Sequence, residues 1–173
     1  MKVARIGTIA AMILAVSTLA WAQKANFSGT WTLDADASGA AGAPAGGGGA
    51  PAAGGGGGGR GGGRGGALGT GPATIKQTAN ALTIERTMGD NKVVTTYKLD
   101  GSESKNTMTG RGGNTMESTS VAKWDGQKLV INTKQAMGDQ TVDTTETWTV
   151  AGNVLTVEST NARGTTKRVY RKQ

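Results

Sequence analysis

Met88-Gly89-Asp90-Asn91-Lys92-Val93-Val94-Thr95-Thr96 recurs later in the chain as Met137-Gly138-Asp139-Gln140-Thr141-Val142-Asp143-Thr144-Thr145. In each copy a Gly-Asp turn joins two runs that are rich in β-branched residues. Strands joined by tight turns pair antiparallel with their neighbours. The repeat therefore predicts a meander of antiparallel strands that follow one another along the chain.

Outside the repeat, alternating apolar and polar residues extend this pattern over most of the chain. Asp100-Gly101 and Asp125-Gly126 are typical of hairpin turns, because glycine accepts a positive φ. We predict an all-β fold, an up-and-down antiparallel meander that closes into a lipocalin/calycin-like barrel of about 8–10 strands, since closure removes exposed sheet edges. The predicted strands are 27–33, 73–78, 81–87, 92–99, 104–109, 115–124, 128–136, 141–150, 154–159 and 165–171.

The predicted inner faces of these strands mix large apolar residues with polar ones. Two interpretations remain open: a polar cavity that holds a ligand, or a small threonine-rich barrel whose partly apolar face is sufficient for folding. The residues predicted to share inner faces are Leu82 and Ile84, Val93, Thr95, Tyr97 and Leu99, Val142, Thr144, Glu146, Trp148 and Val150, and Leu155 and Val157.

The N-terminus has the three parts of a secretory signal. Lys2 and Arg5 precede the apolar run from residue 6 to residue 20, and Ala20-Trp21-Ala22 is a small-x-small cleavage site. We predict that residues 1–22 are a signal peptide, that the protein is periplasmic or extracellular, and that no transmembrane segment remains after cleavage. The chain has no Cys, so an exported form would fold without disulfides.

A glycine- and alanine-rich stretch interrupts the predicted barrel. Residues 39–71 contain 19 Gly and 8 Ala, which bury too little apolar surface to offset the entropy of ordering. We predict a disordered loop over 39–71, with residues 23–38 supplying the first strand and residues 72–173 the remainder of the barrel. Arg60 and Arg64 lie in this loop without interleaved aromatic residues, so we do not expect nucleic-acid binding.

The composition excludes the commonest catalytic and metal chemistry. The chain has no His and no Cys, which removes the usual zinc ligands and the Ser-His-Asp triad. Asp34, Asp36 and Gly39 match the first half of a calcium loop, but Ala45 stands where its bidentate acid belongs. We therefore expect no enzyme activity, no catalytic residues, no metal site and no cofactor.

Three motifs together resemble those of bacterial secreted proteins with a lipocalin-like domain. They are Asn26-Phe27-Ser28-Gly29-Thr30-Trp31 in the first strand, Trp124-Asp125-Gly126 in a turn, and Thr165-Thr166-Lys167-Arg168-Val169-Tyr170 in the last strand. More distantly, the motifs are similar to those of the calycin barrels, including the intracellular fatty-acid-binding proteins. The resemblance implies that Trp31 is a structural plug at one end of the barrel.

The resemblance also implies a ligand site at Arg168 and Tyr170. These residues are two positions apart, so they project from the same face of a strand. In fatty-acid-binding proteins the matching pair points inward and holds a carboxylate. The alternative is that both residues lie on a basic outer surface. The family's second arginine on the antepenultimate strand is replaced here by Glu146, which would repel a carboxylate or pair with Arg168. The family's two lid helices are replaced by the 39–71 stretch.

These observations favour an exported, non-catalytic binding protein that holds a small amphipathic or anionic ligand in its barrel. The alternative is a ligand-free structural or interaction module of the periplasm or cell envelope, whose basic C-terminal face would contact anionic envelope polymers or lipids.

Overall fold

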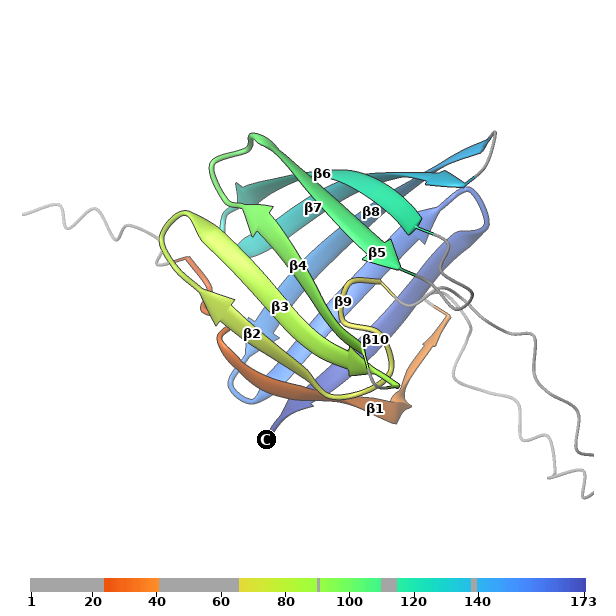
Figure 1. The fold of residues 1–173 in the computed structure, drawn as a ribbon. Helices are drawn as coiled ribbons and strands as arrows, with labels where there is room; N and C mark the ends of the chain where they lie inside the picture. Colours follow the sequence, from red (N-terminus) through yellow and green to blue (C-terminus); the bar gives the residue numbers. More distant parts are fainter. Residues whose placement is uncertain (1–23, 41–65, 90, 110–114, 138–139) are drawn as a thin grey trace, which may run out of the picture.

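The computed structural model describes residues 24–40, 66–89, 91–109, 115–137 and 140–173, and these form one antiparallel barrel (Figure 1). The predicted signal peptide and the Asp90 and Gly138-Asp139 positions of the repeat lie outside these residues. The strands are β1 Gly29–Ala40, β2 Ala73–Gln77, β3 Ala81–Met88, β4 Asn91–Lys98, β5 Glu103–Thr109, β6 Thr115–Asp125, β7 Lys128–Met137, β8 Gln140–Ala151, β9 Val154–Asn161 and β10 Gly164–Lys172.

The strand order confirms the predicted meander. The sheet runs β4-β3-β2-β1-β10-β9-β8-β7-β6-β5, so consecutive strands are neighbours and β1 pairs with β10 to bring the two halves together. The ten predicted strands correspond to the ten observed ones. β1 extends further than predicted, because it continues along β10 after an irregularity in register between Asp34 and Gly39. Within the described residues, no helix is long and apolar enough to cross a membrane.

The barrel is nearly closed, with one seam between β4 and β5 that has no ladder of backbone pairs. Side chains of β5 bridge this seam instead. Asn106 Oδ1 accepts a hydrogen bond from the Thr96 N–H at 2.8 Å, and Asn106 Nδ2 donates to the Thr96 carbonyl at 3.0 Å. Ser104 Oγ accepts from the Lys98 N–H at 2.8 Å. The Asn106 amide thus takes the place of a peptide group of a neighbouring strand.

Replacing Asn106 by alanine is expected to lower the free energy of unfolding by about 2 kcal/mol, because both backbone groups of Thr96 lose their partner at the seam. Asn106→Asp keeps the acceptor oxygen but loses the N–H donor. Its free energy of unfolding should therefore lie between those of the unmodified chain and Asn106→Ala. Thr107→Ala is the matched control, since Thr107 is exposed on the same strand. Chemical denaturation measures all three, and equal stability of Asn106→Ala and Thr107→Ala would contradict the bridging role.

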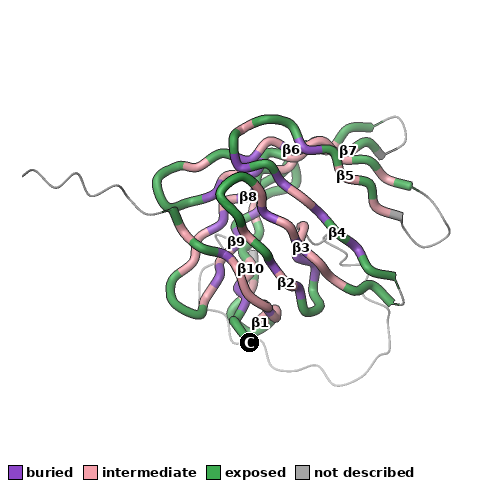
Figure 2. Tube along the Cα trace, turned by 60° about the vertical axis from the view of Figure 1, so that its left-hand side comes forward, coloured by how far each residue is buried: buried purple, intermediate pink, exposed green. Residues whose placement is uncertain are grey.

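Buried positions alternate with more exposed ones along the strands (Figure 2), and the core that they form contains both aliphatic and aromatic side chains. The Phe27 ring stacks on Trp124 at 5.9 Å and meets Trp148 edge-on at 5.8 Å, between ring centroids. Phe27 is held in place by Gln77, whose Oε1 accepts from the Phe27 N–H at 2.8 Å and whose Nε2 donates to the Ala25 carbonyl at 2.9 Å. These bonds attach the residues before β1 (hereafter the N-terminal arm, 24–28) to the end of β2.

The ends of the predicted disordered loop have a defined place. Gly39 and Ala40 belong to β1, and residues 66–71 (hereafter the inner segment) fold back into the barrel before β2. In Figure 1 this yellow stretch lies between β4 in front and β9 and β10 behind. Leu68 is 2% exposed and is part of the hydrophobic core. Leu68 is the one large apolar residue of the predicted loop, which explains why this part is buried. Residues 41–65 lie outside the described residues.

Candidate functional site

Five polar side chains from four strands converge inside the barrel. We call them the polar cluster: Arg86 of β3, Tyr97 of β4, Glu146 of β8, and Arg168 and Tyr170 of β10. Each occupies an inward position of the strand alternation. Tyr97, Glu146 and Tyr170 are buried, while Arg86 and Arg168 are partly buried. The charges of both arginines act on Glu146 and on Tyr170, so the groups form one electrostatic unit.

Glu146 is a carboxylate at 4% exposure in the centre of this cluster. Its Oε2 accepts a hydrogen bond from Trp148 Nε1 at 3.2 Å, and the backbone N–H of Ala67 also donates to the carboxylate. Burial raises the pKa of Glu146, and the hydrogen bonds and the positive charges of Arg168 and Arg86 offset this in part. The sequence left open whether Glu146 repels a ligand carboxylate or pairs with Arg168. The attraction between the Arg168 charge and Glu146 agrees with pairing.

Both tyrosines are protonated hydrogen-bond donors at neutral pH. Tyr170 Oη donates to the Gly69 carbonyl at 2.9 Å, and burial raises the pKa of Tyr170 to about 12. Burial also raises the pKa of Tyr97, with a further contribution from the negative charge of Glu146. The cluster therefore presents phenolic donors beside its two cations.

Arg86 is a member of the cluster that the sequence analysis missed. Its Nη2 lies 3.7 Å from Met108 Sδ, and its Nε is buried without a hydrogen-bond partner among the described residues. Burial lowers the pKa of Arg86, because the guanidinium loses hydration that the cluster replaces only in part. A signal was available: Leu82, Ile84 and Arg86 continue one alternation, so the third residue had to face inward like the first two.

The inner segment covers the polar cluster through close backbone contacts. A Cβ on Gly66 would stand within van der Waals overlap of the Glu146 carboxylate, and one on Gly69 would overlap an Nη of Arg86. Gly69 has φ +66°, and its N–H donates to the Gly66 carbonyl at 2.9 Å to form a tight turn. A side chain at either position would have to displace the end of a charged side chain of the cluster, and at Gly69 the positive φ also favours glycine.

The structure brings two of the three site residues predicted from the sequence, Arg168 and Tyr170, together in the polar cluster. Tyr170 lies inside the barrel, and Arg168 is half-buried on the same face of β10. Lys167 and Arg171 point to the other face of β10 and are exposed, and Arg171 Nε contacts Asp34 Oδ2 at 2.7 Å. β10 therefore has an inner polar face and an outer basic one. Whether Arg168 and Tyr170 bind a ligand stays a prediction.

Trp31 lies in the apolar core rather than in the polar cluster. It is fully buried, its Nε1 donates to the Phe27 carbonyl at 2.8 Å, and Lys172 Nζ lies 5.6 Å from its ring centroid. Its role as a barrel plug stays a prediction. Asp34 of the calcium-like sequence binds Arg171 and the Ala37 N–H, and among the described residues no group of three acidic side chains could hold a metal ion.

No protein-family model and no curated protein matches the chain. Among solved structures, secretory abundant heat soluble protein 4 of Ramazzottius varieornatus is 23% identical; the match covers 62% of this chain and 74% of that one, with a TM-score of 0.45. Human cRBP IV is 19% identical, with 59% and 71% covered and a TM-score of 0.44. Lipid binding protein 8 of Caenorhabditis elegans is 9% identical, with 59% and 70% covered and a TM-score of 0.45.

The ten-stranded antiparallel barrel of this chain confirms the calycin-like fold that the sequence motifs predict. The bacterial origin and the secretion that the resemblance also implies stay predictions.

Proposed function

We propose that this protein is an exported, non-catalytic binding protein for a small amphipathic acid, whose carboxylate binds at the polar cluster and whose apolar part enters the barrel core. One observation carries the proposal: two guanidinium groups face one carboxylate in a largely buried cluster. A buried cation such as Arg86, whose Nε has no acceptor among the described residues, favours an anionic occupant, because a counter-charge can replace the hydration that it has lost.

The donors of the cluster suit a carboxylate. Arg86 Nε has no acceptor among the described residues, and Tyr170 donates to a backbone carbonyl that a ligand oxygen could replace. Arginine binds carboxylates through charge-assisted hydrogen bonds, which are stronger than neutral ones. The buried apolar residues Leu82, Ile84 and Val157 occupy inward positions beside the cluster and would contact the apolar part of the ligand.

The inner segment occupies the space that this ligand needs. Leu68 fills part of the core, and Ala67 and Gly69 use the hydrogen-bonding groups of Glu146 and Tyr170. Ligand binding therefore includes release of the segment. Burial of one leucine stabilises the closed form by about 2 kcal/mol, so its release is within reach of a ligand that buries an alkyl chain of several carbons.

Titration calorimetry with dodecanoate and dodecanol, on the chain beginning at Gln23, tests the proposal. Dodecanoate is expected to bind and dodecanol to bind at least about tenfold more weakly, since the alcohol lacks the charge. Arg86→Met and Arg168→Met should each weaken dodecanoate binding by about 10- to 100-fold, the loss of one charge-assisted interaction.

Lys167→Met is the matched control, because it removes a positive charge from the exposed face of the same strand as Arg168. Its affinity for dodecanoate should equal that of the unmodified chain. Equal affinities for acid and alcohol, or equal losses in Lys167→Met and Arg168→Met, would show that the cluster is not the binding site.

A further inference from the structure

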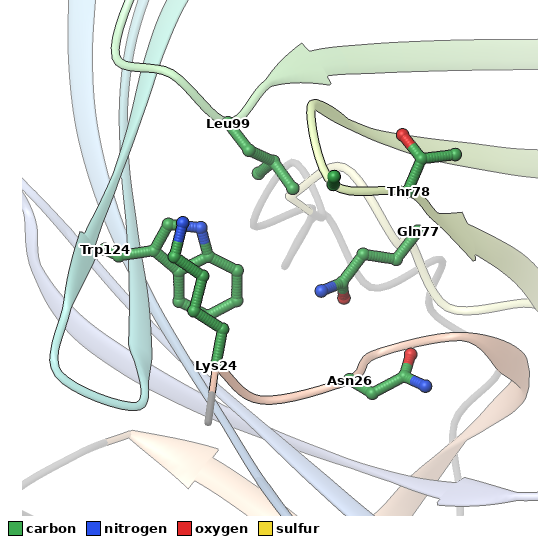
Figure 3. Close-up of a pocket in the computed structure, with 7 residues that line it drawn as sticks. Lys24, Asn26, Gln77, Thr78, Leu99 and Trp124 are labelled. Carbon is green, nitrogen blue, oxygen red and sulfur yellow. The ribbon is translucent and has the colours of Figure 1, made fainter. Parts of the chain in front are cut away.

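A pocket separate from the polar cluster lies at the end of the barrel that carries the turns after β2, β4 and β6 (Figure 3). Its volume is about 290 Å³, just below the range of about 300–1,000 Å³ of small-molecule sites. None of its lining residues belongs to the polar cluster, and the Phe27 ring stands between Trp124 of this pocket and Trp148, which donates to Glu146 of the cluster. The pocket is lined by Lys24, Asn26, Gln77, Thr78, Ala79, Leu99 and Trp124.

Trp124 brings an unsatisfied hydrogen-bond donor to this pocket. Its Nε1 is buried and has no partner among the described residues. The other two tryptophans of the described chain differ, since Trp31 donates to the Phe27 carbonyl and Trp148 donates to Glu146. Buried donors in native proteins nearly always have an acceptor, so one without a partner calls for an explanation.

Lys24 supplies a positive charge at the same place. Its Nζ lies 5.5 Å from the centroid of the Trp124 ring, and in Figure 3 its side chain crosses the face of the indole. Lys24 is exposed, so its side chain can move aside to admit an acceptor and then contact it. An indole N–H and an ammonium group are both donors, and together they require an acceptor that carries negative charge.

The remaining lining groups restrict further the chemical class of ligand that the pocket can bind. The Gln77 amide is engaged at both ends by the N-terminal arm, and Thr78 Oγ1 is engaged with Ala81. These groups are therefore not available as ligand partners. Leu99, Ala79 and the indole ring form an apolar wall. Asn26 Oδ1 accepts a hydrogen bond from the Ser28 N–H, so Asn26 can offer the pocket only its Nδ2 donor. The pocket thus combines donors, one of them charged, with an apolar surface.

We propose that this pocket binds the carboxylate of a small apolar acid between Lys24 Nζ and the Trp124 indole N–H. The occupant is smaller than the ligand proposed for the barrel, and it binds without displacing the inner segment. Benzoate is a suitable probe, because its ring matches the apolar wall and its carboxylate the two donors. Benzyl alcohol is the neutral counterpart.

The test is a titration of the ¹⁵N-labelled chain, beginning at Gln23, with benzoate, followed through the indole N–H signals. Trp124→Phe assigns the Trp124 signal. We expect that signal to shift saturably with benzoate and not with benzyl alcohol. The Trp148 signal should stay in place, because Trp148 reports on Glu146 in the polar cluster. Lys24→Met should weaken benzoate binding about tenfold, and the control Lys123→Met, on the exposed face of β6, should leave it unchanged.

Three outcomes would overturn the inference. The first is a Trp124 signal that does not move. The second is a shift that grows linearly without saturation, which indicates non-specific binding. The third is a shift of the Trp148 signal, alone or together with that of Trp124, which places the probe in the barrel. The outcome of the dodecanoate experiment does not depend on the outcome of the benzoate titration. The first tests Arg86 and Arg168 in the polar cluster, and the second tests Lys24 and Trp124 in the pocket.

Discussion

Leu68→Gly is expected to raise the affinity for dodecanoate by about 10- to 100-fold while it lowers the stability of the free protein. In the unmodified chain, a ligand must displace Leu68 from the core, where it is 2% exposed. Removing the side chain abolishes about 2 kcal/mol of burial that opposes binding, and each 1.4 kcal/mol is about a tenfold change in affinity. The same loss of burial destabilises the closed, ligand-free form. Calorimetry and chemical denaturation measure the two effects.

The opposite signs of these effects make the experiment specific. A leucine that lines the ligand site would lower both stability and affinity when it is removed. A leucine that competes with the ligand lowers stability alone. Thr70→Gly is the matched control, because Thr70 lies in the same inner segment but is exposed. Its affinity should match that of the unmodified chain. Weaker dodecanoate binding by Leu68→Gly would mean that the inner segment is a wall of the site and not its competitor.

The strands and their inner faces could be predicted because the two-residue period is a local property of the chain. Val93, Thr95, Tyr97 and Leu99 were predicted to share an inner face, and all four are buried. The direction of Tyr170 was left open, since β10 carries cationic residues at both alternating positions. Only the register against β9 and β1 decides which of its faces is inside.

Other parts of the site depend on contacts between distant residues. The burial of Leu68 could not be predicted, because the composition of the surrounding stretch predicts disorder. Its position depends on two distant residues: Glu146 accepts a hydrogen bond from the Ala67 N–H, and Tyr170 donates one to the Gly69 carbonyl. The open seam depends on Asn106, whose side chain binds the backbone of Thr96 in place of a strand. Periodicity indicates which residues face inward, but it does not indicate which partner each of them meets.

Glu146→Gln is expected to bind dodecanoate about 10- to 100-fold more tightly than the unmodified chain at neutral pH. The Glu146 carboxylate interacts with the positive charges of Arg168 and Arg86, which the ligand carboxylate would also contact. Two carboxylates in one buried site repel each other. Glutamine keeps the size of the side chain and removes that repulsion. The affinity of the unmodified chain should rise as the pH falls through the raised pKa of Glu146. The affinity of Glu146→Gln should not rise in this way. The only pH dependence expected in this variant is that caused by protonation of dodecanoate itself.

The stability of the ligand-free protein gives an independent readout of the same residue. A carboxyl group whose pKa is raised on folding stabilises the folded state fully below its ordinary pKa of 4.5, and this stability is lost as the pH rises toward the raised pKa. The unmodified chain should therefore lose stability relative to Glu146→Gln as the pH increases above about 4.5. Asp34, Glu85 and Asp100 have lowered pKa values, but they titrate in both proteins and cancel in the difference.

Glu158→Gln is the matched control for Glu146→Gln, because Glu158 is exposed on the neighbouring strand β9. It should show neither the gain in affinity nor the pH-dependent difference in stability. The groups that face Glu146 are Arg86 of β3, Tyr97 of β4, Arg168 and Tyr170 of β10 and the Trp148 indole. Burial raises the pKa of both tyrosines, so neither ionises between pH 4.5 and neutrality. The difference between the two proteins thus isolates Glu146. Weaker binding by Glu146→Gln would mean that Glu146 holds the ligand, which would reverse the charge preference proposed for the barrel.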